Sequence, residues 1–198
     1  CHTARRWRNG LSSATGSSIP RISLALPLFT LLSVTVQAAE LDTPPPGAFT
    51  VVVIPDTQGY RGEGTKATPG STAPLTNPVF ANHIQWIRES AKAQNIVFVS
   101  HVGDIVDINN EQQWTLARQN LDGLLGVVPF GLSVGNHDMQ GSGDASLFQK
   151  HFPAARFKTF AWYGGSYEPE GPTPAAYGNN ANSFQLFSAG GLDFVFLH

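Results

Sequence analysis

Residues 96–107 read IVFVSHVGDIVD, an apolar run followed by a glycine and two aspartates. The apolar part, residues 96–99, is rich in β-branched side chains, which is typical of a buried strand. Gly103 allows the backbone to turn sharply where that strand ends. The stretch therefore predicts a strand that carries the Asp104 carboxylate to the edge of a sheet.

The same arrangement occurs at two other places in the chain. The apolar residues 49–54 precede DTQ at 56–58, and residues 127–134 precede GNHD at 135–138. Pro129 indicates that the third strand begins a residue or two after 127. Because the carboxyl ends of parallel strands meet at one sheet edge, we expect the three loops to converge. Such a site suits a metal that acts on an anionic substrate.

Two helices are expected between these strands. Asn77 and Pro78 are typical of a helix start, as cap and first-turn residue. Apolar residues then recur at helical spacing, at Phe80, Ile84, Ile87 and Ala91 and again at Trp114, Ala117, Leu121 and Leu124. This β-α-β-α-β order predicts parallel strands with right-handed crossovers.

The remainder of the chain has a weaker pattern. Residues 139–182 are polar and glycine-rich without clear periodicity, whereas residues 184–187 and 194–197 are apolar and flank the tripeptide AGG. The last two runs predict an antiparallel hairpin.

Length and composition are those of one globular domain. The 198 residues are 41% hydrophobic, which argues against disorder. Residues 40–198 hold 8 basic and 14 acidic side chains, a net charge of −6, so bulk charge gives no reason to expect nucleic-acid affinity. The sole cysteine, Cys1, lies near the start, so the body is expected to have neither a disulfide nor a thiolate metal site.

Residues 1–39 read as a signal peptide for export. They hold four arginines and no acidic residue, then an apolar segment at 22–36 and a small-residue site at 36–38. The apolar segment contains Pro27 and is shorter than the roughly 20 residues of a membrane-spanning helix. We therefore expect a cleaved signal and no stable membrane span afterwards, with a retained anchor or an apolar helix of the fold as alternatives.

The domain itself is expected at residues 49–198. Residues 40–48 contain three consecutive prolines and are expected to form a linker. The sequence has no initiator methionine and stops close after the apolar run at 194–197, so we expect both ends to be truncated and the domain to be incomplete at its C-terminus.

Residue types indicate what the loops can do. Asp56, Gln58, Asp104 and Asn136 offer hard oxygen ligands, which suit divalent cations such as Mn, Mg and Fe. A carboxylate shared by two cations holds them about 3.5–4 Å apart, and such a pair can activate a water and clamp a phosphoryl group.

His137 adds an acid–base group beside these ligands. Asp107 follows Asp104 by three residues and is close enough to orient His137 by a hydrogen bond. An imidazole held in this way can protonate a leaving-group oxygen.

The strings PDTQ, GDIVD and GNHD, in this order, resemble the motifs of the calcineurin-like metallophosphoesterases. That family's pattern is D-x-H, GD-x-x-D, GNH-D/E, a lone His and finally G-H-x-H. The resemblance is clear over residues 49–138, and the sequence is similar to secreted bacterial members with Gln in the first motif. It implies an α/β fold in which a β-sandwich is flanked by helices (αββα) and a pair of divalent ions drawn from Mn, Fe and Zn.

The resemblance also implies a role for each candidate residue. Asp56 would bind the first metal, Asp104 would bridge both, and Asn136 would bind the second. His137 would contact the phosphate or the leaving group, with Asp107 as its partner.

Two departures from the family pattern affect the assignment of these roles to this chain. Gln58 stands where the family usually has a metal-binding histidine, and an amide oxygen ligates Zn or Fe more weakly than imidazole does. The lone His and G-H-x-H do not occur in the 198 residues, although His198 is a candidate for the lone His. We therefore expect this chain to be poorly active by itself and to bind fewer than two metals.

The leading hypothesis is an exported phosphoesterase that hydrolyses phosphomonoesters or phosphodiesters with a metal-activated water. The alternative is a non-catalytic, secreted binding module on the same scaffold. The substrate within the phosphate esters, the metal and the oligomeric state stay open.

Overall fold

The structure is a computed structural model that describes residues 41–65, 68, 70–141, 143–167 and 180–198. The expected signal peptide lies outside the described residues, and residues 41–49 contain neither helix nor strand. None of the helices in the described part of the chain is long and apolar enough to cross a membrane.

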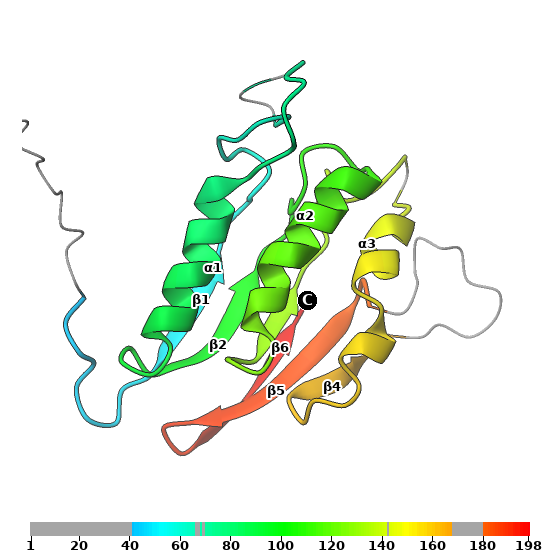
Figure 1. The fold of residues 1–198 in the computed structure, drawn as a ribbon. Helices are drawn as coiled ribbons and strands as arrows, with labels where there is room; N and C mark the ends of the chain where they lie inside the picture. Colours follow the sequence, from blue (N-terminus) through cyan, green and yellow to red (C-terminus); the bar gives the residue numbers. More distant parts are fainter. Residues whose placement is uncertain (1–40, 66–67, 69, 142, 168–179) are drawn as a thin grey trace, which may run out of the picture. The chain divides into compact units, whose positions relative to one another are not determined.

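The first half of the body is the expected parallel sheet. Strands β1 (Thr50–Ile54), β2 (Ile96–His101) and β3 (Phe130–Leu132) lie in the order β1-β2-β3, and both pairings are parallel. Helices α1 (Pro78–Ser90) and α2 (Glu111–Leu121) form the two connections and lie side by side over one face of this sheet (Figure 1). The prediction of parallel strands with helical crossovers is confirmed.

Both helices begin at asparagine caps. The Asn77 side chain accepts a hydrogen bond from the Phe80 N–H at 3.1 Å, and Asn110 does the same for Gln113 at 2.9 Å. Each cap satisfies a backbone donor that has no partner within its helix. The second helix ends at Leu121 and continues as a 3₁₀ turn, Asp122–Leu124, so the expected α-helical periodicity to Leu124 was one turn too long.

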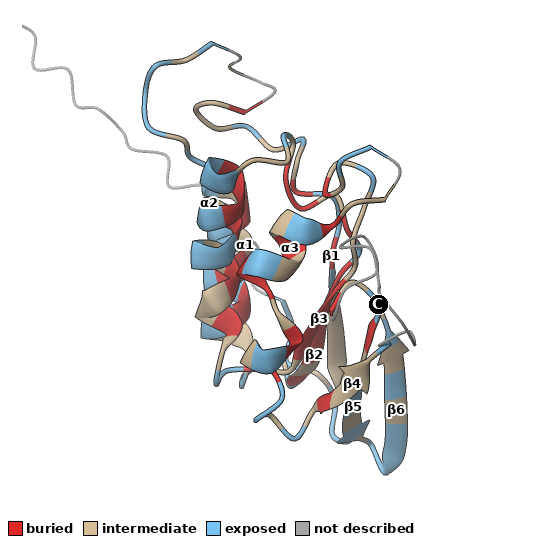
Figure 2. Ribbon diagram, turned by 90° about the vertical axis from the view of Figure 1, so that its right-hand side faces the viewer, coloured by how far each residue is buried: buried red, intermediate tan, exposed pale blue. Residues whose placement is uncertain are grey.

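The second half of the body is an antiparallel sheet. Strands β4 (Tyr163–Ser166), β5 (Ser183–Ala189) and β6 (Leu192–Leu197) lie in the order β4-β5-β6. Strands β5 and β6 form the predicted hairpin, which Gly190 and Gly191 close with positive φ angles of 59° and 76°. The antiparallel sheet covers the face of the parallel sheet opposite to the helices (Figure 2).

Three short elements were missed where the sequence pattern is weak. These are helix α3 (Ser146–His151), the 3₁₀ turn Ala154–Arg156 and strand β4. Six residues are too few to establish a helical period, and β4 contains two glycines, so neither element has a pattern of its own. Strand β4 depends on its pairing with β5.

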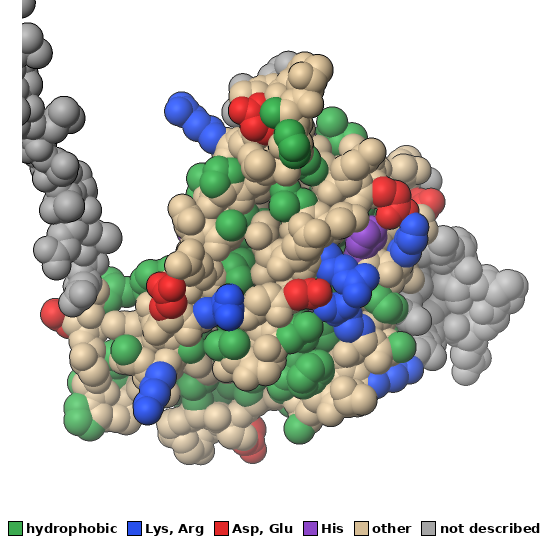
Figure 3. All heavy atoms as spheres, viewed as in Figure 1, with side chains coloured by type: hydrophobic (Ala, Val, Ile, Leu, Met, Phe, Trp, Pro, Cys, Tyr) green, Lys and Arg blue, Asp and Glu red, His purple; other side chains and the backbone are tan. Residues whose placement is uncertain are grey.

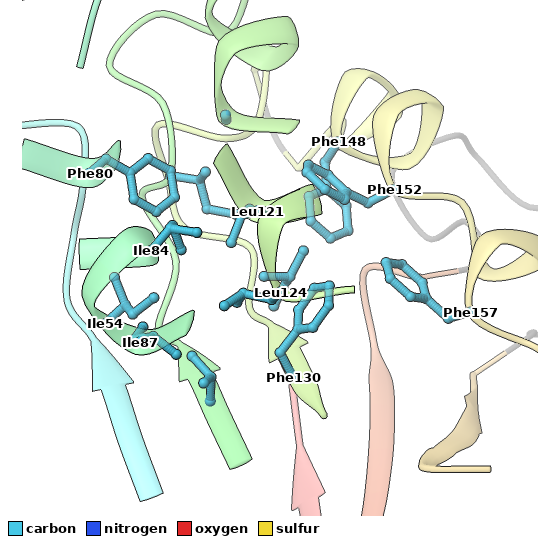
Figure 4. Packing of buried hydrophobic residues seen from close by; sticks show 14 of the residues in the cluster. Ile54, Phe80, Ile84, Ile87, Leu121, Leu124, Phe130, Phe148, Phe152 and Phe157 are labelled. Carbon is cyan, nitrogen blue, oxygen red and sulfur yellow. The ribbon is translucent and has the colours of Figure 1, made fainter. Parts of the chain in front are cut away.

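The main core lies between the helices and the parallel sheet. Figure 4 shows Ile54, Phe80, Ile84 and Ile87 on one side of this core and Phe130, Phe148 and Phe152 on the other. Buried apolar area of this kind contributes about 25 cal/mol per Å², so these aromatic side chains are major contributors to stability. A second apolar layer joins the two sheets, where Phe98 stacks on Phe187 with ring centroids 4.7 Å apart.

His198 belongs to this second layer and not to the ligand loops. Its Nδ1–H donates to Gln185 Oε1 at 2.6 Å, and the Ser100 hydroxyl donates to its Nε2 at 2.8 Å. Gly131 leaves room for it, because a Cβ there would lie 2.3 Å from the His198 ring. The alternative that His198 is the lone metal-binding histidine therefore finds no support in its contacts.

The described residues show one of the two expected helix layers. Helices cover the parallel sheet, whereas no described helix lies on the outer face of the antiparallel sheet (Figure 2). Leu186, Val195 and Leu197 are exposed on the strands β5 and β6 of that sheet.

Charged side chains on the helix-covered face are intermixed. Figure 3 shows basic and acidic atoms next to one another there. Asp122 pairs with both Arg118 and Arg156, and Glu111 pairs with Lys150. Such exposed pairs each contribute little to stability, so the fold depends mainly on its apolar layers.

Candidate metal centre

The three loops meet at Asp104. Loop 1 (residues 56–58), loop 2 (103–107) and loop 3 (135–138) follow β1, β2 and β3 respectively. Asp104 Oδ2 accepts a hydrogen bond from Gln58 Nε2 at 3.0 Å, and Oδ1 accepts one from the His137 backbone N–H at 2.9 Å. The Asp104 carbonyl also accepts from the N–H groups of Thr57 and Gln58. One residue of loop 2 therefore binds both other loops.

Two glycines let loops 2 and 3 approach this closely. A Cβ on Gly135 would lie 2.1 Å from Asp104 Oδ1, and a Cβ on Gly103 would lie 2.8 Å from the Gly135 nitrogen. Gly103 has φ +103°, and Asp104 itself has φ +49°, a region that non-glycine residues seldom adopt. Residues in such sparsely populated backbone regions are often found in functional loops, so this conformation is consistent with a candidate site at Asp104.

The carboxylate of Asp138 links loops 2 and 3. It is fully buried and accepts from the backbone N–H groups of Ile105, Val106 and Gly135 at 2.9–3.1 Å. Burial raises the pKa of Asp138 to about 6, although these three donors favour the charged form and lower it. At neutral pH the carboxylate therefore holds the ends of two strands together.

His137 is oriented by a backbone atom. Its Nδ1 lies 2.9 Å from the Asp107 carbonyl oxygen and 3.8 Å from the Asp107 carboxylate. Because a carbonyl only accepts, Nδ1 carries the proton and Nε2 is the unprotonated nitrogen of the neutral ring. The residue pair matches the expectation, but the closer contact comes from the main chain and not from the carboxylate.

Gln113 of α2 supports this contact. Its Oε1 accepts from the N–H groups of Asp107 and Ile108 at 2.8 and 3.0 Å, and the side chain is buried. The loop that presents the Asp107 carbonyl is therefore held by the first turn of a helix.

Asp56 and Asn136 are exposed at the tips of loops 1 and 3. Burial, and then the negative charge of Asp56, raises the pKa of Tyr60, which follows loop 1. Among the residues that the structure describes, no group of three or more His, Cys, Asp or Glu side chains is arranged to hold a metal. Two of the four expected ligands, Gln58 and Asn136, are amides and do not belong to those types.

The donor set at Asp104 nevertheless fits a hard cation. Gln58 Oε1 is buried and has no hydrogen-bond partner in the described part of the protein. The Nε2 of the same amide donates to Asp104 Oδ2 at 3.0 Å, so the amide group lies beside this carboxylate while its own oxygen has no hydrogen bond within the described residues. Since buried polar atoms normally have partners, this unpartnered oxygen is available to coordinate a cation near loop 1.

Comparison with known proteins agrees with this geometry. The sequence profile of the calcineurin-like phosphoesterases matches residues 49–198, which include all three loops. The chain belongs to this family. The resemblance of the three motifs is thereby confirmed, and so is the mixed α/β architecture.

The calcineurin-like phosphoesterase domain is also similar to individual proteins. It is 33% identical over 123 residues to the uncharacterized protein YvnB of Bacillus subtilis (strain 168), which covers 61% of this chain and 9% of YvnB. Among solved structures, it is similar to the purple acid phosphatase PPD1 from yellow lupin (Lupinus luteus) seeds, with TM-score 0.38 and 19% identity over 74% of this chain and 24% of that one. The chain thus spans a small part of both proteins.

The sequence assigns no supporting role to Thr57 or Gln113, and it places His101 as a buried or supporting histidine and not as a ligand. All three side chains are buried and polar in the structure. The contacts of Asp138 are those of a structural hydrogen-bonder, because its carboxylate accepts from the backbones of loops 2 and 3. A buried polar residue beside a loop of ligands is recognised only when its partners are known.

Proposed function

We propose that this calcineurin-like phosphoesterase domain is part of an exported, metal-dependent enzyme that hydrolyses phosphomonoesters or phosphodiesters. The observation that carries the proposal is the meeting of loops 1, 2 and 3 at Asp104, together with a Gln58 amide oxygen that has no hydrogen-bond partner among the described residues. The family assignment supports phosphate esters as the substrate class. Export rests on the pattern of residues 1–39 alone.

Two divalent ions, drawn from Mn, Fe and Zn, are the cofactors of the proposal. Asp56, Gln58, Asp104 and Asn136 would hold them. When bound, such ions supply a Lewis acid and a water of lowered pKa. Asp104 is the residue best placed to serve both, because its two carboxylate oxygens face loops 1 and 3 respectively.

His137 is the proposed acid. Its Nδ1–H is bound to the Asp107 carbonyl, so a proton transferred to or from the substrate passes through Nε2. The side chain is 30% exposed, which leaves it accessible to a phosphate ester. A positioned acid of this kind contributes about 10²–10⁴-fold to rate.

The alternative, a non-catalytic binding module, is favoured by one observation. Gln58 offers an amide oxygen at a position where the family usually has a metal-binding histidine, and this oxygen ligates Zn or Fe more weakly than imidazole does. A module of this kind would bind phosphate esters without cleaving them.

The test uses the intact gene product supplied with Mn²⁺, Fe²⁺ or Zn²⁺. We expect hydrolysis of p-nitrophenyl phosphate or its bis ester that chelation abolishes, and we expect Asp104→Asn to reduce it by at least about 100-fold, since this change weakens a ligand shared by both sites. If the protein binds metal but hydrolyses neither substrate with any of the three ions, the result would support the binding module instead.

A further inference from the structure

A histidine that the proposed chemistry does not use lies beneath loops 1 and 2. His101 is the last residue of β2 and is 1% exposed. Its ring packs edge-on against Phe80 of α1, with centroids 5.7 Å apart. A polar ring in this apolar position needs partners for both nitrogens, and the loops supply them.

The direction of each hydrogen bond follows from its donors. The Gly103 backbone N–H donates to His101 Nδ1 at 3.2 Å, so Nδ1 carries no proton. The ring proton is therefore on Nε2, which lies 3.3 Å from Thr57 Oγ1 and donates to it. The Thr57 hydroxyl in turn donates to the Ile105 carbonyl at 2.7 Å. These three hydrogen bonds connect Gly103, His101, Thr57 and Ile105 in series, and we call them the His101 relay.

The residues of this relay are the sequence neighbours of the candidate ligands in loops 1 and 2. Thr57 lies between Asp56 and Gln58 in loop 1. Gly103 and Ile105 stand directly before and after Asp104 in loop 2. Thr57 is fully buried, and Ile105 is 2% exposed, so water does not compete for these bonds.

We propose that His101 and Thr57 are positioning residues of the metal centre, and that the neutral, Nε2-protonated imidazole of His101 holds loops 1 and 2 in the relative position that metal binding requires. The proposal rests on the proposed function, because it assigns the relay a role toward the metal ligands. Neither side chain touches the metal or the substrate. Residues that support metal ligands in this way typically change metal affinity by about 10–100-fold when they are replaced.

Electrostatics agree with a neutral ring. Burial, and to a smaller extent the neighbouring His198, lowers the pKa of His101 to about 3. A second proton on Nδ1 would also face the Gly103 N–H, which has no way to accept it.

The first experiment measures Mn²⁺ affinity of the 198-residue chain by calorimetry or by the Mn²⁺ resonance signal. Thr57→Val removes the hydroxyl at nearly constant volume, and His101→Phe removes both ring hydrogen bonds but keeps the contact with Phe80. We expect each to weaken Mn²⁺ binding by about 10-fold or more, whereas Thr57→Ser, which retains the hydroxyl, restores affinity to within about twofold.

His151→Phe is the matched control. His151 is also a buried histidine, 7% exposed, and stacks on Trp114, but it lies on α3 and contacts none of the three loops through its ring nitrogens. We expect this variant to keep its Mn²⁺ affinity even where its thermal unfolding midpoint falls, which separates positioning from general stability.

The second experiment reads the histidine ring nitrogens of the metal-free chain by ¹⁵N NMR. We expect His101 as the Nε2–H tautomer; an Nδ1–H tautomer would overturn the relay whatever the metal data show. Equal Mn²⁺ affinity in the parent, Thr57→Val and His101→Phe would overturn the positioning role but leave the proposed function standing. A parent chain that binds no Mn²⁺ would instead overturn the metal site and, with it, the role assigned to the relay.

Discussion

Asp104 receives hydrogen bonds from two loops that lie far from it in sequence, and single atoms decide whether this is possible. The space for its carboxylate exists because Gly135 has no Cβ. The amide of Gln58 lies on its other side. At the scale of residues, the candidate site depends on the absence of a Cβ at Gly135 and on the side-chain amide of Gln58.

Gly135→Ala is expected to displace the Asp104 carboxylate, because the new methyl carbon would lie 2.1 Å from Oδ1. We expect Mn²⁺ affinity to fall by at least about 10-fold, since a displaced ligand loses its geometry. Gly59→Ala, also near the site, is the control, because its Cβ would meet nothing within 4 Å. Unchanged Mn²⁺ affinity in Gly135→Ala would contradict a ligand role for Asp104.

Gln58→His is expected to change metal preference. Imidazole binds Zn²⁺ more strongly than an amide oxygen does, whereas the two differ less for Mn²⁺. We expect the ratio of Zn²⁺ to Mn²⁺ affinity to rise by about 10-fold, measured by competition with a chelating dye. Gln113→His, a buried glutamine that supports Asp107 from α2, should leave this ratio unaltered. An unaltered ratio in Gln58→His would argue against Gln58 as a ligand.

At the scale of elements, the strand ends are joined by buried polar groups. Asp138 connects the loops after β2 and β3, and the His101 relay connects those after β1 and β2. The helix α2 contributes through Gln113. Since neighbouring parallel strands pair only along their length, these side chains determine how the loops beyond the strands sit against one another.

Asp138→Asn tests the junction of β2 and β3. An asparagine has one acceptor oxygen for three backbone donors, and its NH₂ group would face N–H groups, so we expect a loss of about 2–4 kcal/mol in the free energy of unfolding. Urea unfolding measures this loss. Asp144→Asn provides the comparison, because Asp144 Oδ1 accepts from the Ser146 N–H at the start of α3, an exposed bond that an asparagine oxygen can keep, and we expect this change to cost less than about 1 kcal/mol. Similar losses in both variants would show that the junction contributes little.

At the scale of the whole molecule, two buried histidines make the fold sensitive to acid. Burial lowers the pKa of His101 to about 3 and that of His198 to about 4. The unfolded chain therefore takes up two protons near pH 6.5 that the folded chain does not, which destabilises the folded state as pH falls. Asp138 acts in the opposite direction below pH 6, because its pKa is raised to about 6 and the folded chain binds a proton earlier.

Between pH 6 and pH 5 the unfolded chain therefore binds about one proton more than the folded chain does. We expect the free energy of unfolding of the metal-free chain to fall by about 1.4 kcal/mol per pH unit in this window, measured by urea unfolding at several pH values. His198→Gln should reduce this slope, since it removes one of the two protons. Stability that rises as pH falls from 6 to 5 would contradict the assignment.

The pattern of residues by itself determined the parallel strands, the two helices that connect them and the position of each acidic loop. Residues 96–99 are apolar and rich in β-branched side chains, which indicates a buried strand, and the placement of Asp104 close after it follows from the chain alone. The family motifs can also be recognised from the sequence alone, because each of them is a short, continuous string of residues.

Only the tertiary structure decided which groups support the site. The carbonyl of Asp107, and not its carboxylate, is closest to His137, and the Asp107 backbone is held by a hydrogen bond to Gln113 of α2. The role of His101 likewise depends on Gly103 and Thr57, and on hydrogen bonds that join residues 44 positions apart. Hydrogen bonds between distant loops form only when the sheet brings their ends together, so no local pattern in the sequence records them.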